Sequence, residues 1–257
     1  MPEALYLVDG ERYVPTELTV GPWDARAQHA GPPAALLGRA IEACPPGGQV
    51  GRVTFEILAP VPLEPLTVSA RVVRPGRSVE LLEASLQAEG VEVMRASAWR
   101  LRTESLEGAG EPPRDPPPPG PEQGKTTEPF DTGHEFGYRN AMDAKFVRGS
   151  FLELGPATVW MRMRYPLVAS EEPSPLQRVL CAADSGNGVS AALDYRRYVF
   201  INTDLSVHLH RLPVGEWVCL ESTTRWEPNG VGLADTALWD EQGRIGRGAQ
   251  TLLVRER

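Results

Sequence analysis

An acidic residue at the end of a predicted helix is the first candidate for chemistry in this sequence. Asp184 follows the apolar positions between Leu176 and Ala183 and precedes a glycine-rich turn, 185–188. A helix macrodipole disfavours negative charge at this end by about 0.3–1 kcal/mol, so the carboxylate takes up a proton more readily and suits a general base. A solvated aspartate in the turn accounts for the same residues equally well, and both interpretations stay open here.

A primary amide on the last predicted strand is the second candidate. Alternation along this strand places Gln250 on the same face as Leu252 and Val254, the face that packs against a helix. An amide buried there without partners would cost roughly 1–3 kcal/mol. We favour a functional amide over one that only satisfies the backbone. The matching position in the first half of the chain is the smaller Ser97.

A histidine and a glycine stand where the first predicted helix begins. His29 lies two residues before Gly31, and Gly31 is followed by Pro32 and Pro33, which have no backbone N–H. The N–H of Gly31 is therefore the donor available to an oxygen that develops negative charge at this helix N-terminus. His29 either hydrogen-bonds the reacting group or caps the turn, and the capping role is the simpler interpretation.

The other histidines and the cysteines indicate neither a metal site nor disulfides. His208 and His210 project from one side of a strand without an evident third ligand, so we interpret them as surface or subunit-interface residues. Cys44, Cys181 and Cys219 lie far apart in apolar segments, which is typical of reduced, buried thiols in a cytoplasmic protein. We therefore expect no metal and no cofactor.

Composition and charge narrow the class of partner. The chain has 257 residues and a net charge of −8, which argues against a nucleic-acid partner. No apolar run approaches the roughly 20 residues of a membrane span, and the N-terminus shows no basic region followed by an apolar one. We expect a cytoplasmic protein without a membrane partner, in which a few local arginines could still bind an anionic small molecule.

Two helices and two sets of strands must position the candidate residues. The first helix spans 31–44 and ends at Pro45-Pro46; the second begins after Ser174, a good N-cap, with Pro175 at the first helical position. Alternating apolar and polar residues predict strands over 52–59, 66–74, 79–88 and 91–101 in the first half, and over 157–165, 201–211, 216–226, 231–239 and 244–254 in the second.

These elements recur in one order, so the chain contains one unit twice. The last strand of each half follows a glycine turn, at Gly90 and Gly243, and 52–58 corresponds to 204–210. We predict an α+β fold, a tandem (double) hotdog in which two curved antiparallel sheets each wrap a central helix. The N-terminal hotdog would span 1–102 and the C-terminal hotdog 130–257, joined by a semi-rigid proline-rich linker, 103–129.

Three stretches resemble the double-hotdog acyl-CoA thioesterases of the type II class. They are His29 to Leu37, Asn202 to Arg211, and the strand that carries Gln250. The resemblance extends over nearly the whole chain outside the linker, from about residue 20. It implies hydrolysis of a fatty acyl-CoA to free acid and coenzyme A by direct attack of water. It also implies acyl-CoA as the partner, and a homodimer is common in this family.

The resemblance also implies roles for particular residues. An aspartate after the second helix, a threonine opening the next strand and a glutamine on the last strand bind and activate the water in that family. These positions fall on Asp184, Asn202 and Gln250, and Thr203, next to the threonine position, is a candidate substrate-binding residue with Gly31 and His29. Asparagine can orient a water molecule but has no hydroxyl to relay a proton.

The opposing helix end would supply the remaining groups. In double hotdogs the N-terminus of one copy's helix faces the end of the other copy's helix, which would bring Gly31 and His29 to the thioester.

The position of Asn202 on its predicted strand conflicts with a buried role. Strand alternation places Asn202 on a polar face with Asp204, so a buried side chain there requires a bulge or a site at the open end of the strand. Because the first copy has no matching amide, we expect one working site per chain.

Two other functions fit the fold. A double-hotdog enoyl-CoA hydratase would carry a histidine five residues after the aspartate, where this chain has Val189. A non-catalytic protein that binds acyl-CoA or an acyl lipid is the second alternative, because a fold does not guarantee activity.

Overall fold

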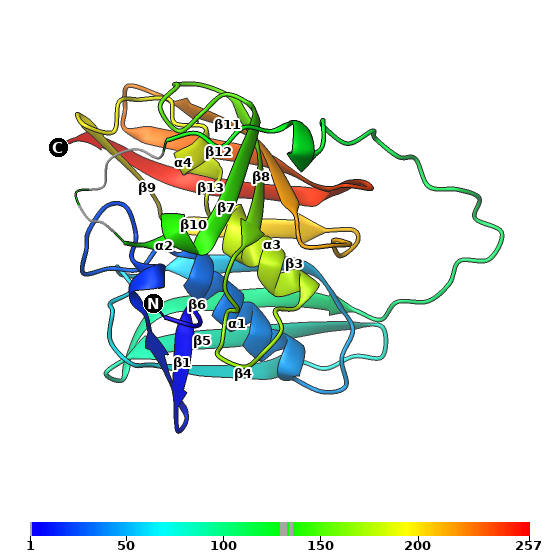
Figure 1. Cartoon of the computed structure of the whole chain (residues 1–257). Helices are drawn as coiled ribbons and strands as arrows, with labels where there is room; N and C mark the ends of the chain where they lie inside the picture. The colour runs from blue at the N-terminus through cyan, green and yellow to red at the C-terminus, as the bar shows by residue number, and fades with distance from the viewer. Residues whose placement is uncertain (1, 129–132, 134–135) are drawn as a thin grey trace.

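The computed structural model describes residues 2–128, 133 and 136–257 (Figure 1). The N-terminal half contains one long helix and six strands among these residues. The elements are β1 (Tyr6–Asp9), β2 (Arg12–Pro15), a 3-10 turn (Glu17–Thr19), α1 (Gly31–Ala43), β3 (Gln49–Ile57), β4 (Leu66–Arg74), β5 (Val79–Ala88) and β6 (Val91–Leu101).

The C-terminal half repeats this plan after the linker. Its elements are a 3-10 turn (Pro121–Gln123), α2 (Tyr138–Ala141), β7 (Met142–Arg148), β8 (Ala157–Met163), α3 (Pro175–Ala183), α4 (Gly186–Val189), β9 (Tyr198–Asn202), β10 (Asp204–Leu209), β11 (Val218–Trp226), β12 (Val231–Asp240) and β13 (Gly243–Glu256). The helices and most strands lie within a few residues of their predicted positions. The sequence pattern missed β1, β2 and β7 and merged β9 with β10.

The double hotdog is confirmed, with one difference from the prediction. The described strands form a single sheet in the order β1-β2-β4-β5-β6-β3-β10-β13-β12-β11-β8-β7, and β9 pairs with β13 outside this path. The two predicted sheets are therefore one, because β3 and β10 pair antiparallel in its middle. Thr54 and Ser206 face each other across this junction with their hydroxyl oxygens 3.0 Å apart. The junction leaves neither strand as an exposed edge.

The two central helices lie side by side against this sheet and run in opposite directions (Figure 1). At one end, Gly31 of α1 approaches the carbonyl oxygen of Cys181 so closely that a Cβ on Gly31 would lie 2.3 Å from it. At the other end, the hydroxyl of Ser174 donates to Glu42 of α1 (2.7 Å) and accepts from the N–H of Gln177, as an N-cap should (3.2 Å).

The two halves share a β-bulge, which fixes how they correspond. Val93 is the extra residue between β5 and β6, and Ile245 is the extra residue between β12 and β13. The copies are thus 152 positions apart (from 93 to 245). Gln250 therefore corresponds to Ala98, and the expected match with Ser97 was wrong by one residue, which is the other face of the strand.

The linker packs against the C-terminal half where it ends. Figure 1 shows the chain after β6 making a long excursion beside the sheet before it returns. The carbonyl of Pro119 accepts a hydrogen bond from the indole N–H of Trp160 (2.7 Å), and Trp160 packs with Cys219 and Trp239 on the outer face of the sheet. The division into 1–102, 103–129 and 130–257 stays a prediction.

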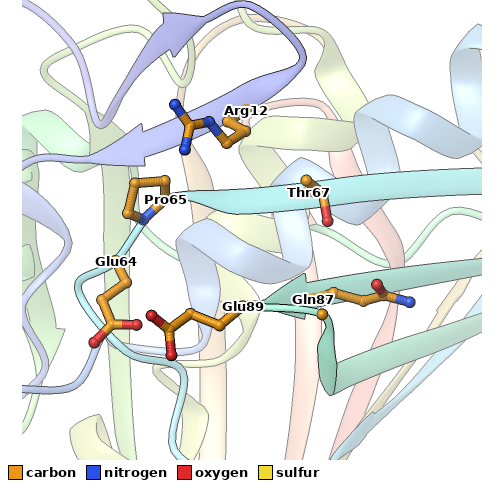
Figure 2. A pocket seen from close by; sticks show the side chains of 7 residues that line it. Arg12, Glu64, Pro65, Thr67, Gln87 and Glu89 are labelled. Carbon is orange, nitrogen blue, oxygen red and sulfur yellow. The ribbon is translucent and has the colours of Figure 1, made fainter.

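A hollow of about 230 Å³ lies on the surface of the N-terminal half between β2, β4 and β5. Figure 2 shows Arg12 on one side of it and the carboxylates of Glu64 and Glu89 on the other. Two carboxylates would repel an anionic ligand, so this hollow does not suit one. The described part of the chain contains no helix with the length and apolar character that a membrane crossing requires.

Candidate active site

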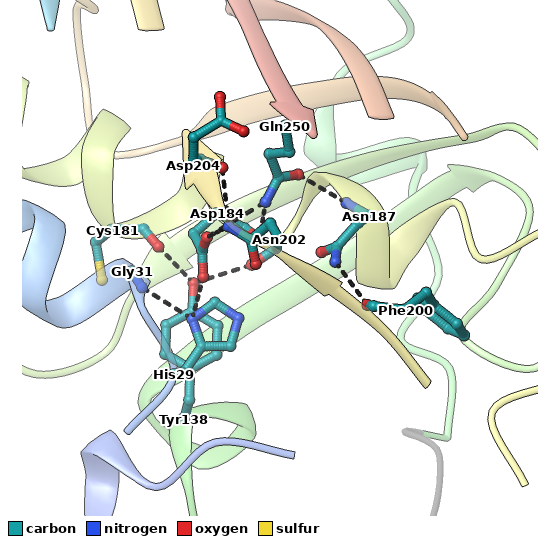
Figure 3. A network of polar contacts seen from close by, with 11 residues as sticks. His29, Gly31, Tyr138, Cys181, Asp184, Asn187, Phe200, Asn202, Asp204 and Gln250 are labelled. Carbon is teal, nitrogen blue, oxygen red and sulfur yellow. Dashed lines mark hydrogen bonds and ion pairs between the residues drawn. The ribbon is translucent and has the colours of Figure 1, made fainter. Parts of the chain in front are cut away.

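A buried carboxylate lies where the end of α3 meets the beginning of α1. Asp184 is the C-cap residue of α3 and is only 4 % exposed. Figure 3 shows its side chain between residues of both halves, with Gln250 and Asn202 on one side and His29 on the other. The predicted residues Asp184, Asn202, Gln250, Gly31 and His29 therefore come together, although up to 221 positions separate them (from 29 to 250).

One carboxylate oxygen, Oδ1 of Asp184, is held by two amides. Asn202 Nδ2 donates to it at 2.8 Å and Gln250 Nε2 at 3.3 Å. Gln250 Nε2 also donates to the backbone carbonyl of Asp184 (3.0 Å). Both amide groups therefore fix the orientation of the carboxylate, and its second oxygen, Oδ2, is directed toward α1.

The amide of Gln250 is itself fixed by α4. Its oxygen accepts the backbone N–H of Asn187 (3.0 Å), which determines which end of the amide carries the donors. A Cβ at Gly186 would lie 2.9 Å from this oxygen and 2.6 Å from the hydroxyl of Thr236, so the glycine allows α4 to sit directly on the amide. Gln250 is 1 % exposed and its hydrogen bonds satisfy it fully in this position.

The Oδ2 side of Asp184 faces His29 and the N-terminus of α1. His29 Nδ1 lies 3.2 Å from Asp184 Oδ2, and the N–H of Gly31 points to the same nitrogen at 3.0 Å. A ring nitrogen either carries a proton or accepts one in a hydrogen bond, so Nδ1 cannot serve both partners at once. When Nδ1 is protonated and donates to Asp184, the N–H of Gly31 is free for another acceptor.

Sequence reasoning missed Tyr138, which covers His29. The two rings are stacked with their centroids 3.8 Å apart and 10° between their planes. The phenol donates to the carbonyl of Cys181 (2.7 Å) and lies 3.1 Å from the hydroxyl of Ser185. Burial raises the pKa of Tyr138 well above its usual value, so the phenol stays protonated. The four-residue α2 that carries Tyr138 has no periodic pattern that could have revealed it.

A bulge resolves the conflict over Asn202. Asn202 is opposite Leu252, whereas Ser206 is opposite Ala249, so three residues of one chain segment face two of the other. The extra residue reverses the alternation and turns Asn202 toward the helices. The carboxylate of Asp204 closes the bulge by accepting the N–H of Thr251 (2.9 Å).

Thr203 does not join the cluster. Its side chain is exposed, and its hydroxyl lies 3.4 Å from Asp204 Oδ1 and 3.5 Å from the carbonyl of Thr251. Thr203 lies in the bulge, outside the described contacts of Asp184, and its substrate-binding role stays a prediction. Asn202, not Thr203, is the residue that donates to Asp184.

Neither cysteines nor histidines outside this cluster offer a nucleophile or a metal site. Burial raises the pKa of the Cys181 and Cys219 thiols, so both stay protonated at neutral pH. His208 and His210 are exposed on the outer face of the sheet, as expected of surface residues. Within residues 2–128, 133 and 136–257, no three His, Cys, Asp or Glu side chains gather as metal ligands would.

The equivalent place in the first half is filled by an arginine. Arg100 is 1 % exposed, donates to the carbonyls of Ile41 (3.3 Å) and Cys44 (2.6 Å) at the end of α1, and pairs with Glu80 (2.8 Å). It thus satisfies the last carbonyls of α1, which would otherwise lack partners. Ala98 stands in place of the amide, and the carboxylate at this end, Glu42, is instead held by Ser174 (2.7 Å) and Gln177 (3.3 Å). One working site per chain stays a prediction.

The protonation of His29 makes stability depend on pH. Burial lowers the pKa of His29 below its ordinary value of 6.5, and the attraction of Asp184 offsets only part of this. Neutral His29 therefore contributes stability above about pH 6.5, and this contribution is lost as the pH falls through the lower folded-state pKa. We expect the free energy of unfolding of the wild type to fall more than that of His29→Gln between about pH 7.5 and 5, measured by urea denaturation. Equal pH dependence of the two proteins would contradict this.

The fold and this cluster stand beside what a comparison with known families shows. The two helix ends of the tandem hotdog bring a buried carboxylate and its amides against an N–H donor. The chain matches the family model for the acyl-CoA thioesterase N-terminal domain over residues 19–101 and that for the C-terminal domain over residues 110–254. The chain therefore belongs to the acyl-CoA thioesterase family and is a thioester hydrolase.

Solved structures support the fold. A Thermobifida fusca protein with a provisional thioesterase II name has 17 % identity and a TM-score of 0.76, with 98 % of this chain and 96 % of that one covered. Acyl-CoA thioesterase II TesB2 from Mycobacterium marinum has 15 % identity and a TM-score of 0.63, covering 88 % and 90 %. A hot dog fold protein of unknown function from Alicyclobacillus acidocaldarius has 18 % identity and a TM-score of 0.72, covering 97 % and 95 %. No curated protein matches the sequence.

Proposed function

We propose that this protein hydrolyses fatty acyl-CoA by direct attack of water, with Asp184 as the general base. The observation that carries the proposal is the asymmetry of the carboxylate. Two amides hold Oδ1, whereas Oδ2 has a single described partner, His29 Nδ1 at 3.2 Å, and keeps a lone pair for a water molecule. A base that is fixed through one oxygen and presents the other is arranged to orient and deprotonate a water molecule.

The thioester carbonyl would bind at the beginning of α1. In this proposal His29 carries its proton on Nδ1 and donates it to Asp184 Oδ2, so the N–H of Gly31 loses its acceptor and becomes available to the carbonyl oxygen of the substrate. The positive end of the α1 dipole adds to the stabilisation of negative charge that this donor provides. His29 and Gly31 thereby act together, since the position of one proton on the imidazole decides whether the Gly31 donor is available.

The reaction then proceeds in two steps without an acyl-enzyme. Asp184 takes a proton from water as the water oxygen bonds to the carbonyl carbon, and the carbonyl electrons move to the oxygen that Gly31 stabilises. The tetrahedral intermediate collapses, the C–S bond breaks, and the proton on Asp184 passes to the departing sulfur. The products are a carboxylic acid and coenzyme A with a free thiol.

This function is tested by following thiol release from short, medium and long acyl-CoAs in water enriched in ¹⁸O. We expect turnover on at least one chain length, with one ¹⁸O atom in the acid after a single turnover. Direct attack predicts this label under single-turnover conditions with enzyme in excess. An acyl-enzyme on the Asp184 carboxylate that is opened by water at the aspartyl carbon would instead place the first-turnover label in the protein and leave the acid unlabelled. Absence of turnover on every chain length would contradict the function.

Gln250→Ala should lower kcat by roughly 10²-fold and leave KM almost unchanged, because the amide positions the base and does not reach the substrate. The loss of its bonds to Asp184 and Asn187 frees the carboxylate to rotate. Thiol release measures the effect, and Gln87→Ala on the surface is the matched control. A rise in KM alone would show that Gln250 contacts the substrate and would contradict the positioning role.

The hydratase alternative finds no support in this geometry. Val189, which occupies the position expected for its histidine, is 1 % exposed and its N–H is bonded to the carbonyl of Ser185 within α4 (2.9 Å). An apolar side chain there can neither donate nor accept a proton.

A further inference from the structure

Two arginines stacked on aromatic rings lie at the outer end of the strand that leads to the candidate active site. The guanidinium of Arg197 lies 5.6 Å from the ring centre of Tyr198, and that of Arg257 lies 5.7 Å from the ring centre of Trp23. The backbone N–H of Arg257 donates to the carbonyl of Arg197 (3.0 Å), so the two side chains originate from neighbouring points. Figure 1 shows the C-terminus beside this end of β9.

These arginines lie in an acidic protein, and Arg257 Nε donates to the carbonyl of Tyr195 (3.0 Å). Both are exposed, and neither forms an ion pair with any residue that the structure describes. The segments 194–198 and 253–257 carry four arginines against two acids, within a chain whose net charge is −8. The aromatic rings restrict the guanidinium groups, so less conformational freedom is lost when an anion binds.

A continuous row of side chains joins this cluster to the catalytic carboxylate. Tyr198, Phe200 and Asn202 share one face of β9, and Asn202 donates to Asp184. The four residue steps from Tyr198 to Asn202 span about 13 Å of extended strand. Trp23 packs edge-on against Phe200 (5.0 Å between ring centres), which belongs to a small apolar cluster separate from the main core.

We propose that Arg197 and Arg257, held by Tyr198 and Trp23, bind the phosphates at the nucleotide end of coenzyme A. This site rests on the proposed function, because it places the pantetheine arm along β9 with the thioester at Asp184. Guanidinium groups bind phosphate with two parallel hydrogen bonds, which neutral or carboxylate surfaces cannot provide. The half-buried rings of Tyr198 and Trp23, which pack on the buried cluster around Phe200, would contact the uncharged arm between the two ends.

A second hollow does not compete for this ligand. It has a volume of about 450 Å³ and is lined by His208, His210, Arg244 and Arg247 on the outer face of the sheet, away from the helices. Arg247 is paired with Asp235 (2.9 Å). Partial loss of solvent and the nearby charges of Arg52 and Arg247 lower the pKa of His208, so it adds no charge at neutral pH.

The test compares acyl-CoA with the matching acyl-pantetheine, which lacks the nucleotide and its phosphates. In the double variant Arg197→Glu/Arg257→Glu we expect KM for acyl-CoA to rise about tenfold or more, with kcat on either substrate and KM for acyl-pantetheine within about twofold of the wild type. Arg95→Glu, an exposed arginine on the N-terminal half, makes the same change of charge per site and should leave both KM values unchanged. Equal rises for both substrates, or none, would overturn the site.

Calorimetric titration with coenzyme A and with pantetheine separates this site from the catalytic function. If coenzyme A binds more tightly than pantetheine and the double variant abolishes the difference, the site holds even when no acyl-CoA is hydrolysed. If turnover is normal and the double variant binds coenzyme A as the wild type does, the site fails while the function stands.

Discussion

Asp184→Asn should lower kcat by about 10³-fold, within the range for loss of a general base. The substitution keeps the shape of the side chain and its bonds through Oδ1 to Asn202 and Gln250, but the amide cannot take a proton from water. Thiol release from the preferred acyl-CoA under saturating conditions measures the change. KM should change little, since the carboxylate acts on the water and not on the bound thioester.

The matched control for this experiment is Asp235→Asn. Asp235 lies on the outer face of the sheet, where its only described partner is Arg247, at 2.9 Å. The Asp235→Asn substitution removes the same charge as Asp184→Asn but lies away from the helix ends, so this variant should keep wild-type turnover. If Asp184→Asn retains more than about a tenth of the wild-type kcat, another group removes the proton and the mechanism is wrong.

Most of the fold could be predicted from the sequence because its elements have strong local patterns. The helix stripe before Asp184, the cap at Ser174 and the alternation that leads to Gln250 all correspond to observed elements. The strands that the sequence did not reveal are short and half exposed, as in β1 and β2, where burial imposes no alternation. The merging of two sheets depends on pairing between β3 and β10, which no local pattern specifies.

The sequence identified those site residues that are polar at positions where a polar group is energetically unfavourable. Asp184 at a helix end and Gln250 on an apolar face are polar groups in places that disfavour them, and both are in the cluster. Alternation alone could not place Asn202 beside Asp184 or Thr203 outside the cluster, because a one-residue bulge reverses the faces of the strand. Tyr138 has no such signal, since its role depends on a contact with His29 across 109 positions (from 29 to 138).

Gly31→Ala should reduce kcat by about 10²-fold and also lower Tm. A Cβ at this position would lie 2.3 Å from the carbonyl oxygen of Cys181, which belongs to the backbone of α3 and cannot rotate away. The two helix ends must therefore separate, at a cost of about 1–3 kcal/mol for overpacking. A shift of about 1 Å between the Gly31 donor and Asp184 is enough to cost 10²-fold in rate.

Two other glycine variants separate the loss of the donor's position from simple loss of stability. In Gly38→Ala the new Cβ meets Leu180 Cδ1 at 2.4 Å, so the same helix pair is overpacked at a flexible side chain and away from the reacting groups. In Gly188→Ala the new Cβ meets nothing within 4 Å. We expect Gly38→Ala to lower Tm with kcat nearly unchanged and Gly188→Ala to change neither. If kcat in all three variants simply follows Tm, the close approach of α1 to α3 serves packing alone, and the N–H of Gly31 has no place in the mechanism.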